Sequence, residues 1–188
     1  MSLIGGLDTE TTGLDQSKGD RIIEVALLTY DTASRKLVDK FVQRIDPERA
    51  ISAGAQDIHG ISYNELVGQP KWEAVAPELQ RRMNALDLAI AHNWGFDGPF
   101  ITGEFARIGM AVPNIASFCT MENGRWACYD GKLPRLQELC IALGVPYDPA
   151  LAHAAEYDVE QTMECFWRGL DRGFYAPPID LSFLKKAA

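Results

Sequence analysis

The sequence predicts an α/β fold in which helices flank one mixed sheet. Three observations lead to this expectation. The first third of the chain is rich in β-branched and alternating segments, the middle carries apolar residues at helical spacing, and the remainder alternates a short apolar strand with further helices. The chain has 188 residues, of which 47% are hydrophobic and 23% charged, which suits one globular domain with a full core.

Three strands are expected in the first third of the chain. Residues 4–10 form a short strand in which Gly5 and Gly6 indicate close backbone packing. Residues 21–30 are a strongly apolar, partly β-branched run, and residues 36–45 alternate apolar with polar side chains, as a strand with one solvated face does. Since only a short turn separates the last two, we expect them to form an antiparallel hairpin.

Most of the remaining chain is expected to be helical. Helices are predicted at residues 51–59, 63–67, 72–86 (with Pro77 as a kink or break), 96–109, 134–143 and 154–170. A buried strand, residues 88–92, lies among them. Residues 1–174 are expected to form the domain, and residues 175–188, which contain Pro177 and Pro178, a short and loosely packed tail.

Charge and composition exclude several classes of protein. A net charge of −8 argues against a broad basic surface that grips long nucleic acid, but not against an enzyme that binds a short end. No apolar run approaches the ~18 residues of a membrane span, and the N-terminus does not resemble a signal peptide, so a cytoplasmic protein without a membrane partner is expected. The four cysteines form no C-x-x-C pair and are expected to be reduced thiols, with a disulfide or structural zinc as the alternative.

Asp8 and Glu10 are the first candidate site residues. Residues i and i+2 of a strand face the same way, so both carboxylates point to one side. Two carboxylates held together repel unless one is protonated or a cation lies between them. A hard divalent metal prefers such oxygen ligands. The alternative is a polar strand end that frays into the turn at Thr11-Thr12-Gly13.

Two further segments carry candidate residues. Asp97 follows the buried strand 88–92, at the end of a strand where α/β proteins place their sites, although aspartate is also a common helix N-cap. His153 precedes the last helix and Asp158 lies five residues later in it. A histidine in that loop would be able to fold back over the same pocket, whereas alone it would be interpreted as a surface residue.

Together these segments resemble the three motifs of the DEDDh family, the DnaQ-like branch of the ribonuclease H-like superfamily. "LDTETTGL" is similar to the first motif, "HNWGFD" to the second and "HAAEYD" to the third, whose histidine separates this branch from one with tyrosine. "DIHGIS" resembles the segment between the first two motifs, and the similarity extends over residues 3–167. The resemblance implies a ribonuclease H-like three-layer fold with one mixed five-stranded sheet.

The resemblance also implies roles for individual residues. Asp8, Glu10 and Asp158 would hold one divalent ion, and Asp8, supported by Asp97, would contact a second, the ions being Mg²⁺ or Mn²⁺. His153 would be the general base that deprotonates the attacking water. The residues near the terminal nucleotide would be Thr11, Leu14, His59 and Asn93.

The implied activity is hydrolysis of 3′-terminal phosphodiester bonds of single-stranded or frayed nucleic acid to nucleoside 5′-monophosphates, with DNA favoured. An exoribonuclease that trims RNA 3′ ends, a nuclease of different polarity and a non-catalytic nucleic-acid-binding module on the same fold are the alternatives. Expected partners are a DNA or RNA 3′ end, a DNA polymerase or another replication or repair protein, and a second copy in a homodimer.

Overall fold

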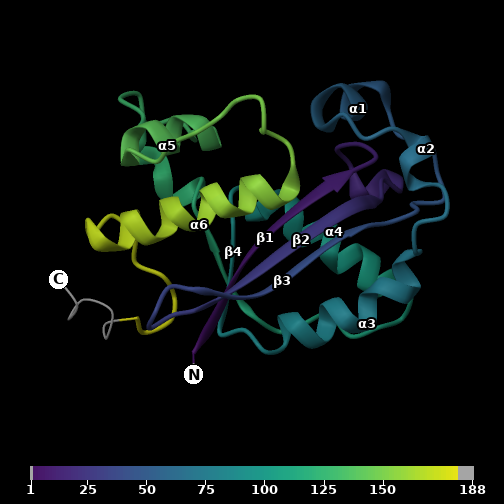
Figure 1. Ribbon diagram of the computed structural model, residues 1–188, viewed down its shortest axis with the longest axis horizontal. Helices are drawn as coiled ribbons and strands as arrows, with labels where there is room; N and C mark the ends of the chain where they lie inside the picture. The colour runs from purple at the N-terminus through teal and green to yellow at the C-terminus, as the bar shows by residue number, and fades with distance from the viewer. Residues whose placement is uncertain (1, 182–188) are drawn as a thin grey trace.

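The computed structural model describes residues 2–181 and has a mixed sheet of five strands at its centre (Figure 1). The strand order is β3-β2-β1-β4-β5. β1 pairs antiparallel with β2 and β2 with β3, whereas β4 is parallel to both β1 and β5. The bounds are Leu3–Thr11 (β1), Ile22–Asp31 (β2), Leu37–Arg44 (β3), Leu88–Ala91 (β4) and Ala116–Cys119 (β5).

Helices cover both faces of this sheet, which confirms the expected three-layer α/β fold (Figure 1). α6 covers one face of the sheet and α5 packs on α6, whereas α3 and α4 cover the other face and enclose a second part of the core. The short helices α1 and α2 stand beside the carboxyl end of β1 (Figure 1). The bounds are Ala53–His59 (α1), Tyr63–Leu66 (α2), Trp72–Met83 (α3), Trp94–Arg107 (α4), Leu136–Leu143 (α5) and Ala155–Asp171 (α6), with 3₁₀ turns at Gln16–Lys18 (η1) and Glu122–Ala127 (η2).

The sequence pattern predicts most of these elements to within a few residues, including the β2–β3 hairpin and the end of α5 at Gly144. It does not locate β5, whose four residues are too few to show alternation and which is defined by its pairing with β4. Pro77 does not break α3, because the buried side chains Val75 and Leu79 on either side hold the helix against the core. Within residues 2–181, none of the helices combines the length and the apolar character that a membrane span requires.

The expectation of a loosely packed tail is wrong for residues 175–181. Tyr175 and Leu181 are buried and belong to the core on the α6 face. The Tyr175 ring contacts Phe118 and Phe166 at centroid distances of 5.1 and 6.2 Å. An aromatic ring of this size supplies enough apolar contact to fix the segment despite its prolines. Residues 182–188 of the expected tail lie outside the described residues.

Gly6 allows α6 to pack directly against the backbone of β1. A Cβ atom at this position would lie 2.6 Å from both Met163 Cγ and Val159 Cγ1 of α6. The missing side chain therefore sets the distance between the helix and the strand. This close approach brings Asp158, in the first turn of α6, toward the acidic end of β1.

We expect Gly6→Ala to destabilise the protein by about 1–3 kcal/mol, because the added methyl group overpacks the contact with Met163 and Val159. Urea denaturation would measure this loss. Gly54→Ala is the matched control: nothing lies within 4 Å of its Cβ position in α1, and alanine favours a helix by up to about 1 kcal/mol. Equal stability of Gly6→Ala and the wild type would contradict this account of the packing.

Candidate active site

Acidic residues from three elements converge at the carboxyl end of β1. Asp8 and Glu10 share the face of β1 that is covered by α6. Asp158 approaches from the first turn of α6, and Asp97 from the first turn of α4. Each of Asp97, Glu10 and Asp158 acts electrostatically on Asp8, so the four predicted carboxylates form one group.

Asp97 is fixed to β1 rather than capping a helix. Its Oδ1 accepts hydrogen bonds from the Thr9 backbone N–H at 3.0 Å and the Thr9 hydroxyl at 2.7 Å, and only 2% of the residue is exposed. The N-cap of α4 is Asn93, so the capping interpretation of Asp97 is wrong. These two bonds join the second motif to the first.

The site strongly favours the protonated forms of its carboxyl groups. Burial, followed by the charges of Asp97, Glu10 and Asp158, raises the pKa of Asp8 well above its ordinary value. Burial and the Asp158 charge raise the pKa of Glu10 to about 8. Burial also raises the pKa of Asp97 to about 7, against the two hydrogen bonds from Thr9, and raises that of Asp158. Positive charge between the carboxylates would relieve this repulsion.

The residues present fit a divalent cation. Asp158 Oδ1 is buried and has no hydrogen-bond partner, which leaves an orphaned carboxylate oxygen beside Asp8 and Glu10. Carboxylate oxygens are the ligands that hard divalent ions prefer. Within residues 2–181, no three His, Cys, Asp or Glu side chains are already grouped closely enough to hold an ion. An ion would therefore have to draw the carboxylates together.

His153 lies beside Asp158 in the loop that leads into α6. Its backbone is left-handed, with φ 64°, and its N–H donates to Asp158 Oδ2 at 3.0 Å. This bond engages one oxygen of Asp158 and leaves the orphaned Oδ1 available. His153 is exposed and close enough to Asp158 and His59 to interact electrostatically with both. Such a position suits a group that exchanges a proton with solvent or with a bound water.

The four predicted substrate-binding residues differ in their surroundings. Leu14 is 78% exposed, whereas the buried Thr11 hydroxyl donates to the Gly13 carbonyl at 2.6 Å. His59 is half-buried at the end of α1; its Nδ1 accepts from Ile61 N–H at 3.0 Å, and burial lowers its pKa. Asn93 is the left-handed N-cap of α4, with φ 89°.

Three of these four residues are joined to the acidic end of β1. The Ser52 N–H donates to the Thr12 carbonyl at 2.9 Å, which holds the start of α1 against the end of β1. Through this contact, His59 lies near Thr11 and His153. Asn93 lies just after the strand β4 that pairs with β1, separated from it by His92, and Thr11 is the last residue of β1.

Glu24 is an acidic residue of the site that sequence reasoning missed. It lies on β2 directly opposite Glu10, is 9% exposed and acts electrostatically on both Glu10 and Asp8. A signal was present in the sequence, because Glu24 is the one charged residue within the apolar run "IIEVALL". Only the strand register shows which neighbour it faces.

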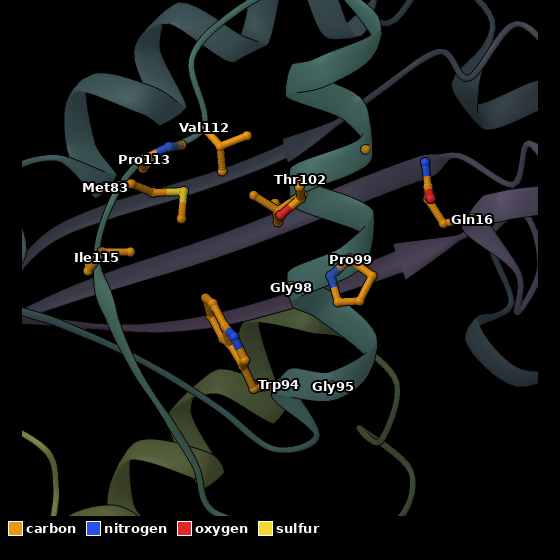
Figure 2. A pocket seen from close by; sticks show the side chains of 12 residues that line it. Gln16, Met83, Trp94, Gly95, Gly98, Pro99, Thr102, Val112, Pro113 and Ile115 are labelled. Carbon is orange, nitrogen blue, oxygen red and sulfur yellow. The ribbon is translucent and has the colours of Figure 1, made fainter.

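A separate, mostly apolar hollow of about 540 Å³ follows the outer side of α4 (Figure 2). Trp94, Met83, Val112 and Ile115 line it, with the Gln16 amide at one end (Figure 2). None of the predicted catalytic or substrate-binding residues borders this hollow. The acidic group at the end of β1 therefore remains the candidate active site.

We expect metal-free protein to lose stability as the pH rises. The pKa of Glu10 is raised from 4.5 to about 8 on folding, so its favourable contribution is full below 4.5 and is lost as the pH passes about 8. A divalent ion binds the deprotonated carboxylates, so Mg²⁺ should stabilise the protein more at about pH 8 than at about pH 5. At a hundredfold excess over its Kd the gain would be about 2.7 kcal/mol.

Thermal denaturation with Mg²⁺ or with chelator at both pH values would test this expectation. Glu160→Gln removes an exposed carboxylate of α6 and controls for net charge. An equal or larger Mg²⁺ effect at the lower pH would contradict it.

Comparison with known proteins identifies the fold and its relatives. The exonuclease family, RNase_T, matches residues 6–166. The chain is 29% identical over 166 residues to the 3′-5′ exonuclease DinG of Bacillus subtilis (strain 168), a match that covers 88% of this chain and 17% of DinG. It is 28% identical over 168 residues to the DNA polymerase III subunit epsilon of Escherichia coli (strain K12), covering 85% of this chain and 68% of that subunit.

Two solved structures share the fold. Escherichia coli exonuclease I in complex with a dT13 oligonucleotide superposes with a TM-score of 0.77 at 19% identity, over 91% of this chain and 41% of that one. Exonuclease X in complex with 5′ overhanging duplex DNA superposes with a TM-score of 0.70 at 22% identity, over 93% and 95%. With the family match extending over all three acidic motifs, this chain belongs to the exonuclease family of DnaQ-like proteins that act on nucleic acids.

Proposed function

We propose that this protein is a metal-dependent 3′–5′ exonuclease that removes nucleoside 5′-monophosphates from single-stranded or frayed 3′ ends. The observation that carries the proposal is the convergence of Asp8, Glu10, Asp97 and Asp158 beside the exposed His153, in a chain of the exonuclease family. The orphaned Asp158 oxygen and the raised pKa values of the carboxyl groups support a cationic cofactor.

Each acid has a distinct position in the proposed mechanism. Asp8, Glu10 and Asp158 would hold one Mg²⁺ or Mn²⁺, and Asp8 with Asp97 a second. Such a pair of ions supplies an activated water and stabilises the leaving 3′ oxygen of an in-line displacement. Thr9 holds Asp97 in place through its two hydrogen bonds. The backbone N–H of His153 holds Asp158 in place through its hydrogen bond to Oδ2.

His153 would accept the proton of the attacking water. The new bond joins that oxygen to phosphorus, and the bond from phosphorus to the 3′ oxygen of the preceding nucleotide breaks. His153 lies in the loop before α6 and is exposed, so the proton would pass on to solvent after each turnover. Its neighbour Asp158 would stabilise the protonated imidazole.

The terminal nucleotide would lie between β1, α1 and the start of α4. The exposed Leu14 would offer an apolar surface for a base, and His59 at the end of α1 and Asn93 at the start of α4 would contact the nucleotide. The turn at Thr11–Gly13, closed by the hydrogen bond from the Thr11 hydroxyl to the Gly13 carbonyl, would contact the nucleotide at the end of β1. The end that reaches these residues would be single-stranded or frayed.

DNA is the favoured substrate because two proteins of the same fold were solved with DNA bound. Trimming of RNA ends is the second candidate, favoured by the match to the RNase_T family. A DNA polymerase remains a proposed partner, since the Escherichia coli relative is a polymerase subunit. Another replication or repair protein is a second proposed partner. A homodimer stays a prediction.

Matched DNA and RNA oligonucleotides, each labelled at the 5′ or the 3′ end, would test the proposal in Mn²⁺. Digestion from the 3′ end should convert 5′-labelled strands into a descending ladder and release the 3′ label at once as a mononucleotide. Robust hydrolysis in the presence of a chelator would contradict the metal-dependent mechanism. Release of the 5′ label as the first product would refute the polarity, and the ratio of the DNA and RNA rates decides the sugar preference.

A further inference from the structure

Three charged side chains form a row across the sheet next to the proposed metal site. Glu10 of β1 lies directly opposite Glu24 of β2, and Glu24 directly opposite Arg44 of β3. Directly opposed residues point to the same face, so the row continues from the acidic group toward the sheet edge. Arg44 Nε donates to Glu24 Oε2 at 3.0 Å, and Arg44 Nη1 donates to Glu65 Oε1 of α2 at 2.9 Å.

The position of Glu24 is unfavourable for the fold alone. Like charges directly opposite one another on neighbouring strands destabilise a sheet, and Glu24 is only 9% exposed. It adds a fifth carboxylate to a region where four already repel, and it acts electrostatically on Asp8 and Glu10. Its guanidinium partner, Arg44, compensates part of this charge.

The backbone beside this row is irregular. The β1–β2 register shifts between Glu10 and Thr11, where Ile22 and Ile23 together oppose one residue of β1. Ile23 is thereby directed to a small cluster with Ile61 and Leu66 under the α1–α2 segment. A bulge re-aims neighbouring side chains, and here it lies immediately after the Glu10–Glu24 pair. Arg44 connects the same segment to Glu24 through Glu65.

We propose that Glu24 and Arg44 are a positioning pair that sets the affinity of the active site for divalent cations. Glu24 adds negative potential at the site, and Arg44 offsets that potential while holding the Glu24 carboxylate in place beside Glu10. This inference rests on the proposed function, because it assumes that the ion binds at Asp8, Glu10 and Asp158. Charges a few ångströms apart in a partly desolvated place interact strongly enough to alter ion binding about tenfold.

The opposing interpretation is that Arg44 only anchors α2. Glu65 already caps the start of α2, since its carboxylate accepts hydrogen bonds from the Ser62 N–H and hydroxyl, each at 2.8 Å. A contact that only fixes α2 to β3 would require Arg44 and Glu65, but it would not require Glu24. The two interpretations therefore differ in what each substitution does to metal binding.

Calorimetric titration of the intact, nucleic-acid-free protein with Mn²⁺ would test the pair. We expect Glu24→Gln to weaken Mn²⁺ binding about tenfold, and Arg44→Met to strengthen it several-fold by leaving Glu24 uncompensated. The double variant should return to within about threefold of the wild type. Glu65→Gln is the matched control, because it removes the second partner of Arg44, and it should lower thermal stability without altering the Mn²⁺ Kd.

Unchanged Mn²⁺ affinity in both single variants, or a change in the same direction, would overturn the proposal. If Arg44→Met does not fold, Arg44→Lys replaces it, and the retained charge should keep the affinity near that of the wild type while Glu24→Gln still weakens it. Asp8→Asn separates the two hypotheses. Mn²⁺ binding that survives Asp8→Asn contradicts the proposed site itself, whereas binding lost there but unaltered by Glu24→Gln contradicts only the pair.

Discussion

Asp8→Asn is expected to lower the rate of 3′-end hydrolysis by about a thousandfold or more while the fold persists. Asp8 is the residue on which the charges of Asp97, Glu10 and Asp158 all act, and it would contact both proposed ions. Loss of this carboxylate would remove several kcal/mol of charge stabilisation, and about 4 kcal/mol corresponds to a thousandfold in rate. The amide has nearly the same shape, so packing is retained.

The effect on stability should have the opposite sign in metal-free protein. The pKa of Asp8 is raised, chiefly by burial, so the charged carboxylate destabilises the folded state as the pH rises. Asp8→Asn should therefore unfold at a higher urea concentration than the wild type at about pH 8 in chelator, and Mg²⁺ should no longer stabilise it. Steady-state hydrolysis and urea denaturation measure the two effects, with Glu160→Gln as the control. A near-wild-type rate would remove Asp8 from the site.

The clustering of the predicted acids could be expected from the sequence through the resemblance to the DEDDh motifs, and strand geometry supports part of it. The period of a strand places Asp8 and Glu10 on one face, and the end of an interior strand places Asp97 at the same edge. The local sequence pattern did not show that Asp158 would lie next to these residues in the folded chain. Asp158 reaches this edge because Gly6 admits α6 so closely, a contact between residues far apart in the sequence.

The features that escaped prediction depend on pairing rather than on local pattern. β5 forms by pairing with the edge of β4, and the four residues of β5 show no periodic pattern. Tyr175 is buried because it covers Gly169, where an added Cβ would lie 2.3 Å from the ring. Glu24 faces Glu10 in the antiparallel register that runs unbroken from the Leu3–Asp31 pair to this one, just before the bulge. Each of these depends on long-range contacts that composition and spacing do not encode.

His153→Asn is expected to slow hydrolysis by about a hundredfold to ten-thousandfold, the usual contribution of a general base. Asparagine is the informative replacement because His153 has φ 64°, a left-handed conformation that asparagine adopts more readily than alanine. Its backbone N–H would still donate to Asp158 Oδ2. The substitution therefore removes the imidazole while the acidic group keeps its arrangement.

Two measurements distinguish a base from a residue that only shapes the loop. Mn²⁺ titration of His153→Asn should give the wild-type Kd, because the orphaned Asp158 oxygen and the carboxylates of β1 are unaltered. The loss should fall on kcat, with KM for the oligonucleotide nearly unchanged, since proton transfer occurs in the transition state. If His153→Ala lowered Mn²⁺ affinity and His153→Asn restored both affinity and rate, the loop conformation would be the essential feature, and the imidazole would not be the base.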